Sequence, residues 1–153
     1  MNKYLKIALY FFGILLVIQF ITIDKTAPKL EGRLDFMEIE APPKEIATLI
    51  KNACYDCHSY ETKFPSYSSY APISWVIGNH VQEGREHLNF SIWGSYQDEV
   101  RKDLLHNSYK QIGARQMPMY GYVMYHKEAK IQNAELEKFY TWFKQQLNKY
   151  NIK

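Results

Sequence analysis

Both cysteines of the chain lie in one contiguous unit, Cys54-Tyr55-Asp56-Cys57-His58. Two thiols separated by two residues match the spacing of the vinyl groups of a porphyrin, and the histidine that follows falls beneath the metal. Each of these side chains therefore has a task in haem attachment: the thiols of Cys54 and Cys57 form thioethers, and His58 binds the iron. The unit predicts one covalently attached haem c.

Other chemistries also use paired cysteines. A thioredoxin-like redox pair, a strained disulfide and half of a Cys/His zinc site each need less of the pattern than haem attachment does. A zinc site would need a further ligand from elsewhere, and the sequence has neither a second C-x-x-C nor an H-x-x-x-H. Haem is therefore the favoured interpretation.

The amino-terminal region is strongly apolar. Lys3 and Lys6 precede an apolar run from Ile7 to Ile23, at the short end of the about 17 to 25 residues that a membrane helix needs. The residues before Asp24 are bulky, whereas cleaved signal peptides end in small residues, so residues 1–23 are predicted to be a retained anchor rather than a signal peptide. The lysines place the amino terminus in the cytoplasm. We therefore expect a single-pass protein of the bacterial inner membrane with its haem domain on the periplasmic side.

The rest of the chain is long enough for one compact domain. Prolines and a glycine interrupt residues 24–43, which are predicted to be a linker. Residues 44–150 are predicted to form the c-type haem-binding domain. The formal net charge of +3 is mild and the basic residues are scattered, which excludes a nucleic-acid-binding protein.

Helical spacing of apolar residues recurs throughout the predicted domain, and no segment alternates with a period of two. A short helix from Lys44 leads into Cys54, and Pro72 can open a helix that runs towards Leu88. Further helices are predicted over residues 97–112 and through an apolar stripe from Leu136 to Leu147. The prediction is an all-α, cytochrome c-like helical domain preceded by one amino-terminal transmembrane helix.

A second axial ligand of the iron must come from outside the motif. The candidates are the methionines and histidines downstream of it, namely Met117, Met119, Met124, His80, His87, His106 and His126. A thioether favours ferrous iron and suits electron transfer. Met117 is preferred because it follows a predicted helix and a glycine and precedes Pro118, which stiffens the loop. Met119 and a histidine remain the alternatives, and a lone methionine can also simply fill a core.

Several segments together resemble the small bacterial haem-binding domain family of c-type cytochromes. They are Cys54–Ser59, Trp75–Val81, Glu83–Phe90, Met117-Pro118 and Tyr125–Ala129. The resemblance implies an anchored extracytoplasmic domain with one covalent haem, in which Cys54, Cys57, His58 and Met117 have the binding roles. Met119 stands where the family usually has a second proline, so the choice between Met117 and Met119 stays open.

The expected function is electron transfer between redox protein partners, with the membrane contacted through the amino-terminal helix and no catalytic group required. We therefore do not expect an enzyme. The alternative is a haem-based sensor or a peroxidase-like haem enzyme, which would keep an exchangeable sixth position. Carbon monoxide binding to the reduced protein separates the two classes, since a firmly bound methionine resists that ligand.

Overall fold

The computed structural model describes residues 1–29 and 31–151, and every regular element in these ranges is a helix. The all-α prediction is therefore confirmed. The elements, with η marking short 3₁₀ helices, are α1 (Lys3–Ile18), η1 (Gly32–Leu34), α2 (Phe36–Glu40), α3 (Lys44–Ala53), α4 (Tyr55–His58), η2 (Ser66–Ser69), α5 (Ile73–His87), η3 (Phe90–Ser95), α6 (Asp98–Gly113), α7 (Tyr120–Tyr125), η4 (Lys127–Ala129) and α8 (Asn133–Asn151).

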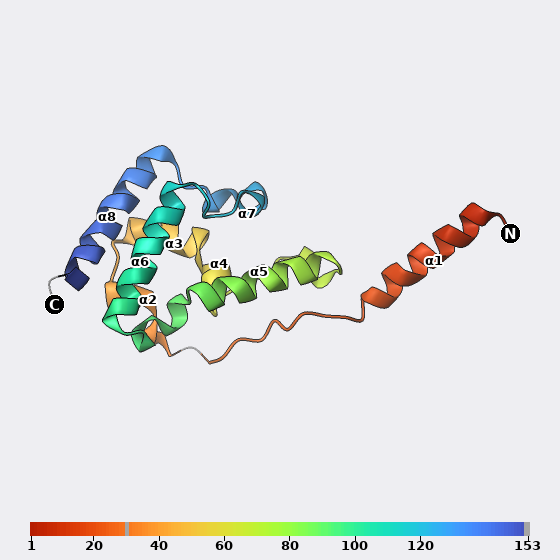
Figure 1. The fold of residues 1–153 in the computed structure, drawn as a ribbon, viewed down its shortest axis with the longest axis horizontal. Coiled ribbons are helices and arrows are strands. Elements are labelled where there is room, and N and C mark those ends of the chain that lie inside the picture. Colours follow the sequence, from red (N-terminus) through yellow and green to blue (C-terminus); the bar gives the residue numbers. More distant parts are fainter. Residues whose placement is uncertain (30, 152–153) are drawn as a thin grey trace.

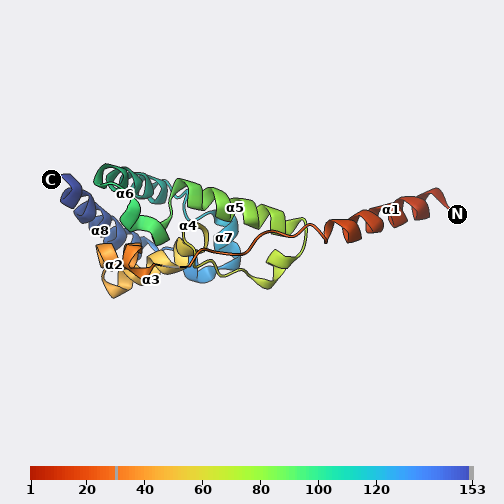
Figure 2. The same ribbon diagram turned by 90° about the horizontal axis from the view of Figure 1, so that it is seen from below.

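Most of these helices form one body, and α1 projects from it on an extended segment (Figures 1 and 2). α1 and the carboxyl-terminal end of α8 lie at opposite ends of the longest axis (Figures 1 and 2). Within the body α6 packs against α8, and α4 packs against α5. The cysteine motif, which ends in α4, therefore lies between α3 and α5.

The structure corrects the prediction of a membrane anchor. α1 has 16 residues, so it is about 24 Å long, whereas a bilayer core is about 30 Å thick. Within residues 1–29 and 31–151 no helix combines the length and the apolar character needed to cross a membrane. The predicted transmembrane helix and the predicted single-pass inner-membrane location are therefore wrong.

The apolar run is divided because its second part leaves the helix. Gln19 ends α1, and its side-chain amide donates to the carbonyls of Leu15 and Ala71 at 2.9 and 3.1 Å. The backbone carbonyl of Ile21 then accepts a hydrogen bond from the indole of Trp75 at 2.8 Å. We call residues 19–25 the docking segment, because they lie against the amino-terminal part of α5. A prediction from hydropathy alone does not take these hydrogen bonds into account.

The segment predicted to be a linker, residues 24–43, contains a helix that belongs to the core. The side chain of Asp35 caps α2 by accepting from the backbone N–H of Met37 at 2.8 Å. Phe36 follows and is fully buried, and its ring meets those of Phe90 and Trp93 edge to face, at 4.8 and 4.9 Å between centroids. The packed body therefore begins upstream of the predicted domain.

The remaining core joins the carboxyl-terminal helices to α3. Leu105 and Ile112 of α6 are buried, as are Phe139 and Phe143 of α8, whose rings stack at 4.6 Å. The predicted apolar stripe of α8 therefore faces the core, as its spacing requires. This packing leaves α4, the first half of α5 and α7 to surround a hollow on one side of the body.

Candidate functional site

The motif occupies a kink between two helices. α3 ends at Ala53, and Cys54 leaves helical geometry at φ −126° and ψ −38° before α4 begins. The backbone N–H groups of Cys57 and His58 both donate to the carbonyl of Cys54, at 3.2 and 2.9 Å. One tight turn therefore holds Cys54, Cys57 and His58 together, and both cysteines are free thiols.

The imidazole of His58 is held by α5. Its Nδ1 lies 2.8 Å from the carbonyl oxygen of Gly84 and 3.1 Å from that of Leu88. Carbonyls only accept, so Nδ1 carries the hydrogen and Nε2 keeps its lone pair. Burial lowers the pKa of His58, which favours the neutral ring. A neutral, oriented imidazole is the form that binds a metal ion.

The close approach of α5 depends on a glycine. A Cβ atom at Gly84 would lie 2.6 Å from the carbonyl oxygen of Cys57. The neighbouring Arg85 donates from Nε to the carbonyl of Ser59 at 2.8 Å and from Nη2 to Oγ1 of Thr62 at 2.9 Å. These contacts clamp the chain just after the motif against α5.

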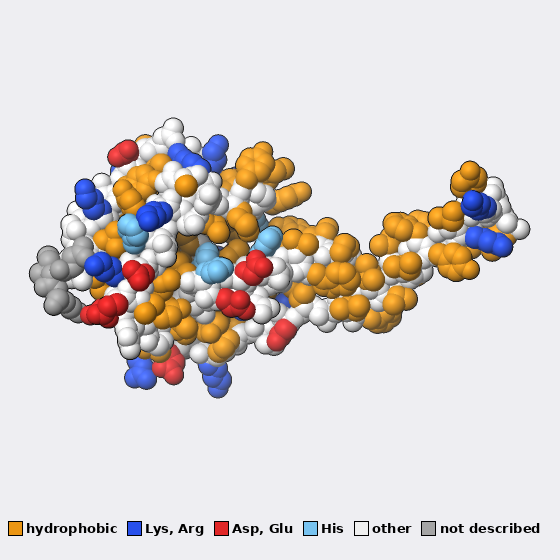
Figure 3. All heavy atoms as spheres, viewed as in Figure 1, with side chains coloured by type: hydrophobic (Ala, Val, Ile, Leu, Met, Phe, Trp, Pro, Cys, Tyr) orange, Lys and Arg blue, Asp and Glu red, His pale blue; other side chains and the backbone are white. Residues whose placement is uncertain are grey.

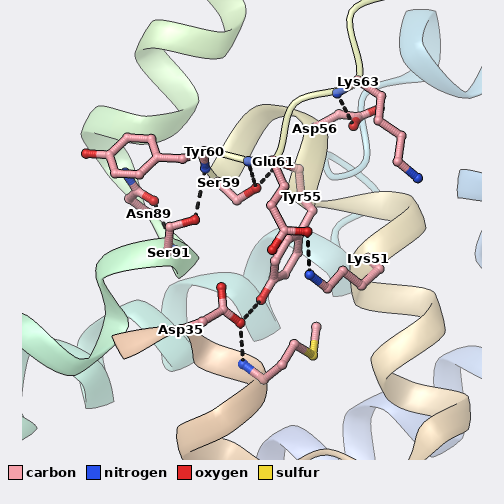
Figure 4. Close-up of polar contacts among 11 residues, drawn as sticks. Asp35, Lys51, Tyr55, Asp56, Ser59, Tyr60, Glu61, Lys63, Asn89 and Ser91 are labelled. Carbon is pink, nitrogen blue, oxygen red and sulfur yellow. Dashed lines mark hydrogen bonds and ion pairs between the residues drawn. The ribbon is translucent and has the colours of Figure 1, made fainter. Parts of the chain in front are cut away.

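A second set of polar contacts fixes the motif from the other side (Figure 4). The hydroxyl of Tyr55 donates to Oδ1 of Asp35 at 2.8 Å, and the Tyr55 ring stacks on Phe90 at 5.2 Å. The ammonium of Lys51 lies 3.9 Å from the centroid of the Tyr55 ring. Burial, reinforced by the carboxylate of Asp35, raises the pKa of Tyr55 well above its ordinary value. The first residue between the cysteines is therefore a core anchor.

The alternative chemistries of the cysteine pair gain no support. Burial raises the pKa of Cys54 to about 12 and that of Cys57 to about 11, so both thiols stay protonated near neutral pH. A reactive redox pair needs a lowered thiol pKa. Within residues 1–29 and 31–151 no three His, Cys, Asp or Glu side chains are grouped as a metal ion would require.

A cavity of about 430 Å³ adjoins the motif. The molecule is hollowed between α5 and α7 on the side shown in Figure 3. The walls of the cavity are formed by the motif, the loop before η2, one face of α5, and α7 with the residues that flank it. The lining residues used below are Asp56, Cys57, Tyr67, Val76, Ile77, His80, Val81, Met119, Tyr122, Tyr125 and His126.

One wall of this cavity is a chain of polar contacts. The hydroxyl of Tyr122 donates to Oδ2 of Asp56 at 2.7 Å, and the Tyr122 ring stacks on that of His126 at 4.3 Å. The Nε2 of His126 lies 3.2 Å from the hydroxyl of Tyr67, and its Nδ1 lies 3.3 Å from Oε1 of Glu128. Burial, then the hydrogen bond to Asp56, raises the pKa of Tyr122. No pattern in the sequence distinguishes Tyr67 or Tyr122 from the other tyrosines.

The structure separates the two leading methionine candidates. Met119 lines the cavity together with Cys57. Met117 is 37 % exposed and lines a smaller depression with Ile112 and Leu136. Its backbone N–H donates to the carbonyl of Gln111 at 3.3 Å, which holds Met117 against the end of α6.

The other predicted site residues also fall into two groups, those that line the cavity and those that do not. Cys54 and His58 share the turn with Cys57 but are not part of the cavity wall, whereas His80 and His126 are. The remaining candidates, Met124, His87 and His106, lie outside that wall.

The donor set fits a haem. Two free thiols and an imidazole with a free Nε2 lie in one turn, next to a cavity whose α5 wall is apolar apart from His80.

Comparison with known proteins agrees with this donor set. A family model described as a haem-binding domain matches residues 13–145. No curated protein and no solved structure matches the chain significantly. The matched range contains the motif, the cavity and the polar wall.

Proposed function

From the premise that this chain belongs to the haem-binding domain family and binds haem, we propose that it is an electron-transfer protein with one covalently attached haem c. Cys54 and Cys57 form the two thioethers, and His58 is an iron ligand. Redox proteins are its partners, and it is not an enzyme.

The orientation of His58 carries this proposal. Hydrogen bonds from Nδ1 to two backbone carbonyls fix the ring and its tautomer, so Nε2 keeps the lone pair that would bind the iron. Such a bond also raises the basicity of the coordinating nitrogen. A structural histidine would need neither two carbonyl acceptors nor two thiols in the same turn.

Covalent attachment requires reduced cysteines and no oxidant. Each thiol adds its S–H across one vinyl group, so that sulfur bonds to one carbon and the hydrogen moves to its neighbour. Cys54 and Cys57 are free thiols, and Cys57 faces the cavity.

Electron transfer is favoured because the cavity opens to the surface. The bound haem supplies the iron couple that takes up and releases one electron. Val76 and Tyr125, on opposite walls, are 56 % and 74 % exposed. They would keep the cofactor edge within reach of a docked redox partner while Ile77 and Val81 exclude water.

A sensor or a peroxidase-like enzyme is the second candidate, favoured by the polar wall. His80 and His126 line the same cavity and could serve a small ligand bound at an exchangeable sixth position. Such a protein would bind carbon monoxide readily in its reduced form.

The test uses the full chain, co-expressed with haem-maturation machinery. We expect haem to remain on the chain in a denaturing gel, and to be lost when Cys54 and Cys57 are both replaced by serine. The reduced wild type should be low-spin and resistant to carbon monoxide. A wild type without covalent haem would refute the c-type assignment, and rapid carbon monoxide binding would favour the sensor or enzyme.

A further inference from the structure

One residue of the polar wall, Tyr122, lies on the short helix α7, which begins directly after one of the candidate methionines, Met119. Met119 caps the amino terminus of α7, and Tyr122 lies one turn later. The hydroxyl of Tyr122 donates to Oδ2 of Asp56, the residue directly before Cys57. α7 is therefore joined to the haem-attachment turn by a hydrogen bond of 2.7 Å.

A second contact strengthens this junction. The Tyr122 hydroxyl also lies 3.4 Å from the carbonyl of Asn52, at the end of α3. On its other side the Tyr122 ring stacks on His126. The stacking on the C-cap residue of α7 orients the ring, and the contacts of its hydroxyl with Asp56 and Asn52 limit how far α7 can move from the motif.

We propose that Met119 is the second axial ligand of the iron and that the Tyr122–Asp56 hydrogen bond is the latch that holds it in reach. This inference rests on the proposed function, since it names the sixth ligand of the same haem. Met119 is the one methionine in the wall of the cavity that Cys57 faces, within residues 1–29 and 31–151.

The histidines in that wall are less suited to the role. Both ring nitrogens of His126 have partners, namely the hydroxyl of Tyr67 and the carboxylate of Glu128. His80 precedes Gly84 by one turn on α5, so the two lie on one face of that helix. Because the carbonyl of Gly84 orients His58, His80 belongs to the wall that supports the first ligand. The second ligand has to approach the opposite face of the haem.

The chemistry of a thioether agrees with the surroundings. Methionine sulfur is a soft ligand without a proton to lose, so it can bind iron in an apolar cavity without leaving a buried charge behind. It stabilises ferrous iron and raises the reduction potential.

Replacement of each methionine in the haem-loaded full chain is the first test. We expect Met119→Leu, which keeps the volume of the side chain, to abolish the weak red charge-transfer band of methionine-bound ferric haem. It should also lower the potential and admit carbon monoxide to the ferrous protein. Met117→Leu is the matched control and should change none of these. Met119→His should give a bis-histidine spectrum, which shows that residue 119 reaches the iron.

The latch has its own test, because it acts through Met119. Tyr122→Phe removes only the hydroxyl and keeps the ring on His126. We expect it to weaken the charge-transfer band and to speed carbon monoxide binding while the helical content and the amount of covalent haem stay unchanged. Tyr120→Phe, which removes an exposed hydroxyl from the same helix outside the cavity wall, is the control and should leave the band intact.

The outcomes are separable. Loss of the band in Met117→Leu, or its absence from a wild type that carries covalent haem, would overturn the assignment of Met119 and leave the proposed function standing. An unchanged band in Tyr122→Phe would overturn the latch. A wild type without covalent haem would refute the proposed function itself, and the ligand assignment with it.

Discussion

At the scale of single residues, the turn of the cysteine motif depends on the missing side chain at position 84. Gly84 lets the backbone of α5 come against the carbonyl of Cys57, and the same residue offers its own carbonyl to His58. A side chain at position 84 would act on both the turn of the cysteine motif and His58. The neighbouring Arg85 extends the contact to Ser59.

Replacement of Gly84 by alanine should therefore destabilise the protein. The added Cβ meets backbone rather than a flexible side chain, so α5 has to shift, at a cost of about 1 to 3 kcal/mol. Chemical denaturation measures the loss, and haem content per chain should fall with it. Gly13→Ala is the control, since nothing lies within 4 Å of its added Cβ. Equal stability of the two variants would contradict the close approach.

A tyrosine near the carboxyl terminus makes the fold sensitive to alkali. Tyr150 donates a hydrogen bond to Glu40, and burial with this carboxylate raises the pKa of Tyr150 from 10.0 to about 12. A raised pKa in the folded state stabilises the fold below pH 10, and this contribution is lost as pH rises through 12. The free energy of unfolding should therefore fall between these values. The decline should be smaller in Tyr150→Phe, and an identical decline would show that Tyr150 does not contribute.

At the scale of elements, the predictions succeeded where the determining contacts are local. The stripe of α8 repeats within one helix, so it can be recognised from sequence alone. α2 is too short for a periodic signal and lies between prolines, and its burial depends on Phe90 and Trp93, far along the chain. The sequence could not choose between Met117 and Met119 for a similar reason. The choice depends on a backbone hydrogen bond between Met117 and Gln111 at the end of α6, which leaves Met119 to line the cavity.

The apolar amino-terminal run shows a different limit. Its composition is that of a membrane segment, but the helix ends where Gln19 finds partners on Ala71. A hydropathy profile sums over side chains and does not show where a helix stops. Contacts with a segment about fifty residues away in the chain, such as those of Gln19 and Ile21, are visible only in three dimensions.

Truncation of α2 at its buried face should be costly. Phe36→Ala removes a fully buried ring from among aromatic neighbours, which costs about 3 to 5 kcal/mol in comparable cores. Ile39→Ala, on the same helix but 37 % exposed, is the matched control and should cost far less. Denaturant titration of both variants is the measurement. Similar small losses would show that α2 does not belong to the core.

At the scale of the whole molecule, the cavity is a substantial gap in a small body. Filling it with a haem would add contacts to α5, α7 and the loop before η2 at once. A bound haem should therefore stabilise the protein as a unit. The polar wall that links Tyr67, His126, Tyr122 and Asp56 joins η2, α7 and α4.

The variant with serine at positions 54 and 57 should consequently melt at a lower temperature than the haem-loaded wild type. The cause is the loss of the contacts made by the cofactor rather than the loss of two sulfur atoms. Circular dichroism during heating measures the difference. The control is wild type produced without haem-maturation machinery, which should melt close to the serine variant. A haem-free wild type as stable as the loaded one would contradict this expectation.

The docking segment gives α5 contacts on two sides. Trp75 and Gly78 meet residues 21 and 23 on the helix face opposite to Val76, Ile77 and His80, which line the cavity. Gln19 and Ala71 are joined by two reciprocal hydrogen bonds, so a pull on α1 loads both together. A force applied to α1 would therefore be transmitted to the cavity wall formed by α5 before it reached the hydrophobic core.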